Sequence, residues 1–245
     1  MDNAKMDVKI YDDMNSKATL REHFSENMVP WGTFFLEQGQ LPQDGIVYAQ
    51  SMIRQFWSAV LRASHGVSGF GLIIINTIEE LQDFLQKLPQ YHAIQAFPAL
   101  LIEREVPKKD IKFSPSCQAT IHDDGKVSLI WAGIQTLNQH NQHEWNLQFL
   151  EFDTSLVTAM REMAEHVWAK YHGETWFHGL FGVDFLLVDN TTSVPWDLRE
   201  VSYHWKIYKL VMVEVNARMT GSHAWLTIGS ILKYVKDNIT AQIWN

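Results

Sequence analysis

Polar and apolar side chains alternate in one segment near the carboxyl end of the chain, residues 211–218 (VMVEVNAR). In a β-strand, Glu214, Asn216 and Arg218 would share one face and point away from the three valines. Residues two apart on a face lie about 6.5–7 Å apart at the backbone. Glu214 and Asn216 can therefore bind one or two hard cations through oxygen while Arg218 contacts a phosphate. The alternative interpretation is the solvated face of an edge strand.

A single acidic residue interrupts a second apolar segment. Asp184 is the one charge inside residues 182–188 (GVDFLLV). A buried carboxylate is costly unless it is paired or bound to a metal ion. Beside Glu214 and Asn216, it would complete an oxygen-rich site of the kind that Mg²⁺ (or Mn²⁺) prefers. Considered alone, Asp184 is equally compatible with capping a loop at the end of a strand.

Glycines mark a third segment, between two strand-like runs. Residues 58–63 (SAVLRA) and 72–75 (LIII) flank HGVSGFG at positions 65–71. The backbone N–H groups of such a hairpin tip can cover phosphates, and Arg62 stands at the end of the preceding strand. An ordinary turn next to a surface charge is the simpler interpretation.

The rest of the chain mixes helices with strands, which indicates the α+β class. Helices are expected at 17–26, from the capping box at 77–80 (TIEE), and along Leu156–Val167 up to Gly173. The helix that starts at 77–80 has one apolar face, formed by Ile78, Leu81, Leu85 and Leu88. Strands are expected at 99–105, 116–133 with a turn at 123–125, 181–189 and 209–217.

Composition excludes several function classes. A formal charge of −8 over 245 residues argues against a sequence-independent nucleic-acid binder, which needs a basic surface. Cys117 is the only cysteine, so neither an intrachain disulfide nor a CxxC motif can form. The chain lacks a long apolar run, and its first residues lack a signal-peptide core. We therefore expect a cytoplasmic protein with no membrane or nucleic-acid partner.

Together, these segments resemble the ATP-grasp superfamily. The motifs are GVDFLLVD with MVEVNARMTG, preceded by the strand–loop–strand segment VLRASHGVSGFG. The resemblance extends from about Lys17 to Gly221 and implies two α+β lobes whose antiparallel sheets hold ATP between them. On this basis we expect an N-terminal segment at 1–50, a small lobe with a glycine-rich lid at 51–138, and a C-terminal lobe with the metal site at 139–245.

The resemblance also implies roles for individual residues. Asp184, Glu214 and Asn216 resemble the magnesium ligands, and Arg218 resembles the arginine that steadies the γ-phosphate and the transition state. Arg62 stands where the family usually has a lysine on the α- and β-phosphates, which keeps the charge but changes its geometry. The other implied nucleotide contacts form the lid, the adenine linker, a ribose-binding acid and a lysine at the head of the first helix: Gly66, Ser68, Gly69, Gly71; Glu103, Arg104, Glu105, Val106; Asp110; and Lys17.

The resemblance implies an ATP- and magnesium-dependent ligase. In such enzymes ATP phosphorylates a small carboxylate, and an amine or thiol then displaces the phosphate. We expect residues 190–208 and 220–223 to select the substrates. Two alternatives are a nucleotide-binding regulatory module without turnover and a phosphotransferase that stops at phosphorylation.

Ligases of this family carry a further N-terminal α/β domain, whereas this sequence starts almost at the first ATP-grasp helix. Three explanations follow from the resemblance. The chain is a fragment, it receives the domain from a homodimer mate or a partner chain, or it is a minimal variant with altered chemistry.

Overall fold

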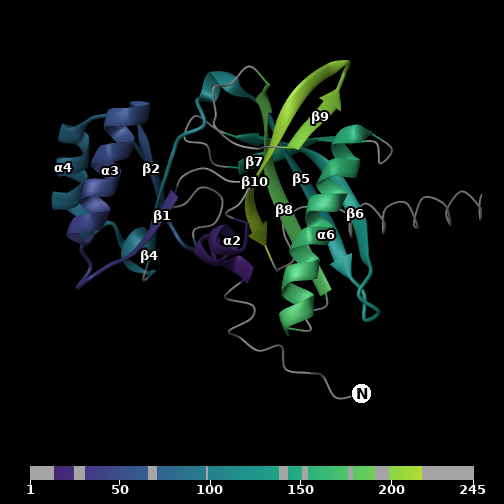
Figure 1. Cartoon of the computed structure of the whole chain (residues 1–245), viewed down its shortest axis with the longest axis horizontal. Helices are drawn as coiled ribbons and strands as arrows, with labels where there is room; N and C mark the ends of the chain where they lie inside the picture. Colours follow the sequence, from purple (N-terminus) through teal and green to yellow (C-terminus); the bar gives the residue numbers. More distant parts are fainter. Residues whose placement is uncertain are drawn as a thin grey trace, which may run out of the picture.

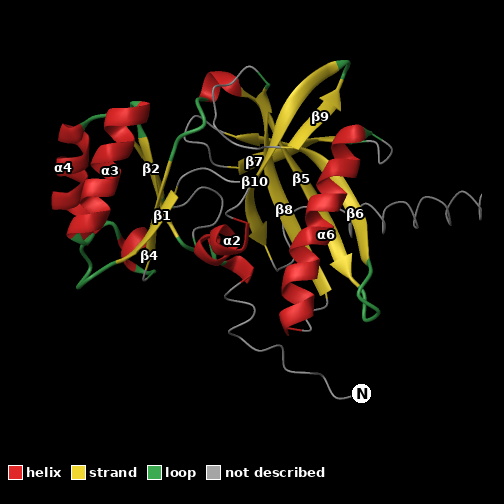
Figure 2. Ribbon diagram, viewed as in Figure 1, coloured by secondary structure: helices red, strands yellow, loops and turns green. Residues whose placement is uncertain are grey.

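The computed structural model describes residues 14–24, 31–65, 71–97, 99–137, 143–150, 154–175, 179–190 and 199–216. These residues form two separate sheets, with strand orders β1-β4-β2-β3 and β7-β6-β5-β8-β10-β9 (Figure 1). All strand pairs in both sheets are antiparallel. Figure 2 shows helices beside each sheet, so the expected α+β class is confirmed.

The four-stranded sheet carries helices on one face. Its strands are β1 (Trp31–Phe35), β2 (Ala59–Ala63), β3 (Leu72–Ile75) and β4 (Ala99–Glu103). The helices α3 (Gln43–Phe56) and α4 (Ile78–Lys87) pack against it through a core that includes Leu61, Leu81 and Ile102. Two short elements, η2 (Leu88–Gln90) and α5 (His92–Gln95), lead from α4 to β4.

The helix α4 begins at the predicted capping box. The Thr77 side chain accepts the backbone N–H of Glu80 at 3.1 Å. The Glu80 carboxylate accepts the backbone N–H of Asn76 at 2.7 Å, one residue before the position that a standard capping box uses. Leu81 and Leu88 on the predicted apolar face are buried. The predicted helix is confirmed, and its apolar face packs in the core, with Ile78 and Leu85 half-buried.

The six-stranded sheet carries the long helix α6 (Ser155–Thr175) on one face. Phe181, Phe185 and Met160 are fully buried in the core between them. Its strands are β5 (Ile111–Ile121), β6 (Val127–Leu137), β7 (His143–Phe149), β8 (Gly179–Asp189), β9 (Arg199–Tyr203) and β10 (Lys206–Asn216). The short η3 (Lys108–Asp110) leads into β5, and α2 (Lys17–Phe24) lies between the two sheets.

None of the described helices combines the length and apolar character needed to cross a bilayer.

Several elements differ from the sequence-based expectation. No strand was expected at β7, which follows the expected lobe boundary at 138/139, or at β9, which lies in the segment 190–208 expected to select the substrates. Both are edge strands, which pair on one side only and need less apolar sequence. β1 and α3 were not predicted, and α6 continues past Gly173 to Thr175 because a glycine inside a helix costs only about 1 kcal/mol.

The change of sheet does not coincide with the lobe boundary expected at 138/139. β5 and β6, which we had assigned to the small lobe, pair with each other and with β8 in the six-stranded sheet. The four-stranded sheet ends at Glu103 and the six-stranded sheet begins at Ile111. We therefore propose that the lobes meet between these two residues.

A β-bulge in β10 determines which side chains leave the core. Met212 pairs with Phe185 and Glu214 pairs with Asp184, so Val213 is an extra residue on β10. Met212 and Val215 both pack in the core with α6, whereas Val211 and Val213 join a small cluster on the other face. The expectation that Glu214 and Asn216 point away from all three valines is therefore wrong for Val211 and Val213. The bulge shifts the alternation by one residue.

Cys117 offers a probe of this sheet. Its side chain is fully buried in the core with α6, and burial, followed by the negative charge of Asp184, raises the pKa of the thiol. Because the thiolate is the reactive form, we expect a disulfide reagent to label the native chain at least about a thousandfold more slowly than the unfolded chain. The rate is measured with and without denaturant, and Cys117→Ser serves as the blank. Equal rates would show that Cys117 is not buried.

Candidate functional site

The three predicted metal ligands lie together on the face of the six-stranded sheet opposite α6. Asp184 on β8 pairs directly with Glu214 on β10, and side chains at such paired positions have Cβ atoms about 4.5–5.5 Å apart. The Asn216 amide donates a hydrogen bond from Nδ2 to Asp184 Oδ2 at 3.1 Å. The structure therefore brings two carboxylates and one amide into a single cluster.

A fourth residue of this cluster was not predicted. Gln135 on β6 donates a hydrogen bond from Nε2 to Asp184 Oδ1 at 3.1 Å. Asp184 thus receives an amide donor on each of its oxygens, which orients the carboxylate. The sequence shows Gln135 only as a polar residue in a strand, and nothing in its spacing links it to Asp184.

Lys17 joins the cluster of Asp184, Glu214 and Asn216 to the other sheet. Its Nζ lies 3.1 Å from Glu214 Oε1, and the two side chains are only 4% and 15% exposed. Its backbone N–H donates a hydrogen bond to the carbonyl of Ser64, just after β2, at 2.7 Å. The resemblance implied a phosphate contact for Lys17, and the structure places its ammonium group against a predicted metal ligand.

A second ion pair lies on the four-stranded sheet. Arg62 Nε on β2 is 3.4 Å from Glu103 Oε2 on β4, and these side chains are 16% and 8% exposed. Their neighbours Leu61 and Ile102 point into the core with α3 and α4, so Arg62 and Glu103 occupy the opposite face. Figure 1 shows this face turned toward α2 and the six-stranded sheet.

The segment after Glu103 carries the other predicted adenine contacts. The Arg104 guanidinium lies 4.2 Å from the centre of the Phe56 ring, and burial lowers its pKa. Val106 packs against Val188 and Val211 on the face that carries Asp184, while Glu105 is half-buried. This segment therefore passes from the Arg62 face of one sheet to the Asp184 face of the other.

The other predicted nucleotide contacts are only partly described. Gly71 has φ of +80°, a backbone conformation that favours glycine, and its carbonyl accepts the backbone N–H of Ala63 at 2.9 Å. Asp110 ends η3 and is half-buried. The remaining predicted residues lie outside the described part of the chain: Gly66, Ser68, Gly69 and Arg218.

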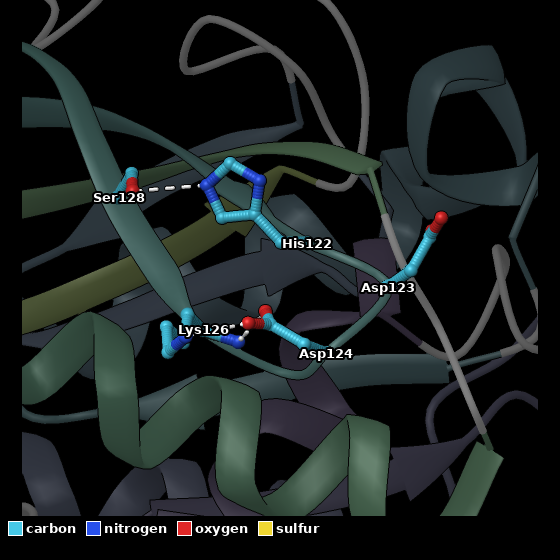
Figure 3. Close-up of a pocket in the computed structure, with 5 residues that line it drawn as sticks. All are labelled: His122, Asp123, Asp124, Lys126 and Ser128. Atoms are coloured by element: carbon cyan, nitrogen blue, oxygen red, sulfur yellow. Dashed lines mark hydrogen bonds and ion pairs between the residues drawn. The ribbon is translucent and has the colours of Figure 1, made fainter.

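A hollow of about 540 Å³ lies elsewhere, at the turn between β5 and β6 (Figure 3). It is lined by exposed residues, His122, Asp123, Asp124, Lys126 and Ser128. A hydrogen bond from Lys126 lowers the pKa of Asp124. The strand before the turn ends opposite Gly179, which lies about 16 Å along β8 from Asp184. The hollow therefore belongs to the turn and lies apart from the predicted site.

No protein-family profile and no curated protein sequence matches the chain. Solved structures do match it. A biotin carboxylase–β,γ-ATP complex from Campylobacter jejuni is 14% identical over 90% of this chain and 44% of that one, with a TM-score of 0.64. The biotin carboxylase domain of the Hydrogenobacter thermophilus 2-oxoglutarate carboxylase, with MgADP, ADP and bicarbonate, is 19% identical over 88% and 42%, with a TM-score of 0.59.

A third match is D-alanyl-alanine synthetase A from Vibrio cholerae, 17% identical over 83% of this chain and 55% of that one, with a TM-score of 0.54. The chain spans about half the length of these structures. At such identities the likeness shows the fold, and the chain has the ATP-grasp fold.

The pair formed by Lys17 and Glu214 makes a testable contribution to stability. Removing the cation alone, in Lys17→Met, leaves a largely buried carboxylate without that partner and is expected to lower the free energy of unfolding by about 3–5 kcal/mol. Removing both charges, in Lys17→Met with Glu214→Gln, should recover much of this loss. Denaturant unfolding of the two single variants and the double variant measures the coupling between them. Purely additive losses would contradict a direct interaction.

Proposed function

We propose that this chain binds ATP with Mg²⁺ between its two sheets and activates a small carboxylate for attack by an amine. The observation that carries the proposal is the direct pairing of Asp184 with Glu214, with Asn216 bonded to Asp184. The ATP-grasp fold supports it, because one matched structure holds MgADP and bicarbonate. The cytoplasmic location and a partner chain or homodimer mate stay predictions.

The cluster suits a hard divalent cation. Two carboxylates and an amide provide oxygen donors, which Mg²⁺ and Mn²⁺ prefer over the nitrogen and sulfur donors typical of zinc sites. Among the described residues, no group of three or more His, Cys, Asp or Glu side chains competes for such a metal. Asp184, Glu214 and Asn216 would therefore hold the ion, with phosphate oxygens and water as its other ligands.

The cations near this site suit phosphate binding. Lys17 and Arg62 each contact a carboxylate, so phosphate oxygens would replace one negative partner with another instead of meeting an unpaired buried charge. The Nε of Arg62 is buried and has no hydrogen-bond partner in the described structure, although Glu103 lies close. Arg62 therefore retains a donor for a ligand.

Phosphoryl transfer requires mainly positioning and neutralisation of negative charge. The bound magnesium nucleotide supplies the phosphoryl group and much of that neutralisation. Lys17 and Arg62 would add positive charge and hold the phosphates in place. Glu103 and the backbone of residues 104–106 would bind the purine, Asp110 the ribose, and the glycines at 66–71 would exclude water. Arg218 is the proposed contact of the γ-phosphate.

Magnesium-dependent nucleotide binding is tested by thermal unfolding with a non-hydrolysable ATP analogue. At about a hundred times its Kd, such a ligand should add about 2.7 kcal/mol of stability, which raises Tm by roughly 5–10 °C in a chain of this size. We expect the magnesium-dependent part of the shift to be lost in Asp184→Asn and in Asn216→Ala. Each variant is compared with its own ligand-free Tm.

The matched control is Asp189→Asn on the same strand, where a half-exposed carboxylate pairs with Lys112 at the surface. It should keep the full ligand-induced shift. A shift retained in both site variants would contradict the metal assignment.

A separate assay of turnover distinguishes a ligase from a regulatory module that only binds nucleotide. A ligase should release phosphate in the presence of its carboxylate, and hydroxylamine should trap the acyl phosphate.

A further inference from the structure

One buried side chain next to the proposed metal site has an unsatisfied polar atom. Gln118 on β5 is 1% exposed, and its Oε1 has no hydrogen-bond partner in the described structure. Its Nε2 donates a long hydrogen bond of 3.4 Å to the hydroxyl of Ser116, which is fully buried. A buried carbonyl without a donor destabilises a fold, so a bound ligand is a natural partner for it.

The strand register places Gln118 next to the metal cluster. Gln118 pairs with Gly182, which pairs with Asn216. In the adjacent row on the same face, Ser116 pairs with Asp184, which pairs with Glu214. Such rows are about 6.5–7 Å apart along the strands. The unpaired carbonyl thus lies one row away from the two carboxylates.

Gly182 makes room for this side chain. A Cβ atom at position 182 would lie 2.7 Å from Gln118 Oε1 and 3.0 Å from its Nε2. The absence of a side chain on β8 therefore lets the Gln118 amide lie close against the strand backbone. A side chain at position 182 would push the Gln118 amide away from its place beside Gly182 and Asn216.

We propose that Gln118 Oε1 binds an N–H group of the amine substrate. This inference rests on the proposed ligase function. A carbonyl oxygen only accepts hydrogen bonds, so it recognises a donor such as an amine and would gain nothing from a carboxylate substrate. The Gln118–Gly182 row is thus the amine subsite.

The test compares amine binding to the full chain in Gln118→Leu, which removes the acceptor at similar size, and in the wild type. Calorimetry with the magnesium–AMP-PNP complex present measures the Kd of ammonium, methylamine and a panel of free α-amino acids. We expect Gln118→Leu to weaken amine binding about tenfold or more and to change nucleotide affinity less than twofold. Gln118→Glu, which keeps an acceptor, should retain amine binding.

Thr120→Val is the matched control, on the same strand and sheet face but one row further from the metal cluster. It should leave amine binding unchanged. Equal amine affinity in Gln118→Leu and the wild type would overturn the inference, and so would a wild-type chain that binds nucleotide but none of the amines. A wild-type chain that does not bind magnesium–AMP-PNP would instead contradict the proposed function.

Stability provides a second measurement, which does not depend on the ligand. Because Gln118→Leu and Gln118→Met remove an unpaired buried acceptor, both should unfold at the wild-type temperature or above it. The Tm of each variant is measured without ligand. A clear fall in Tm in both variants would show that Gln118 has a structural partner, and it would overturn the assignment of its carbonyl to a substrate.

Discussion

The rest of the site depends on the buried ion pair between the Lys17 ammonium group and Glu214. The Lys17 Nζ pairs with Glu214 on the six-stranded sheet, while the Lys17 backbone N–H bonds to Ser64 beside the four-stranded sheet. A charge with 4% exposure is costly without a close partner, so this contact constrains where α2 lies relative to both sheets. The face with Arg62 and the face with Asp184 are thereby turned toward the space that α2 occupies.

The polar residues on these faces oppose the stability of the fold. Two largely buried ion pairs, an unpaired carbonyl on Gln118 and a β-bulge at Val213 each cost more than apolar packing in a regular strand would. Glu214, Gln118 and the bulge lie on the same face of the six-stranded sheet, whereas the core with α6 consists of apolar side chains. Such a concentration of unfavourable features is typical of a binding site, where function is selected against stability.

The ATP-grasp fold alone leaves the substrates open. The matched structures include biotin carboxylases and a D-alanyl-alanine synthetase, at identities between 14% and 19%. One fold thus supports several reactions, and the side chains placed on it decide which substrate binds. In this chain the row with Asp184 and Glu214 is joined to the row with Gln118 through β8 and β10, so the proposed metal and amine positions share one sheet.

The sequence by itself determined the elements whose signals are local. The hairpin of β2 and β3, the cap of α4, and strands β8 and β10 follow from alternation, glycines and capping residues within a few positions. The sequence also indicated Asp184, Glu214 and Asn216 as candidate ligands, because polar side chains stand out in otherwise apolar strands. Only the tertiary structure decided the edge strands β7 and β9, the bulge at Val213, and the positions of Gln135 and Gln118 beside Asp184 and Gly182. These depend on strand register and on contacts such as that of Lys17 with Glu214, 197 residues apart, which no local pattern encodes.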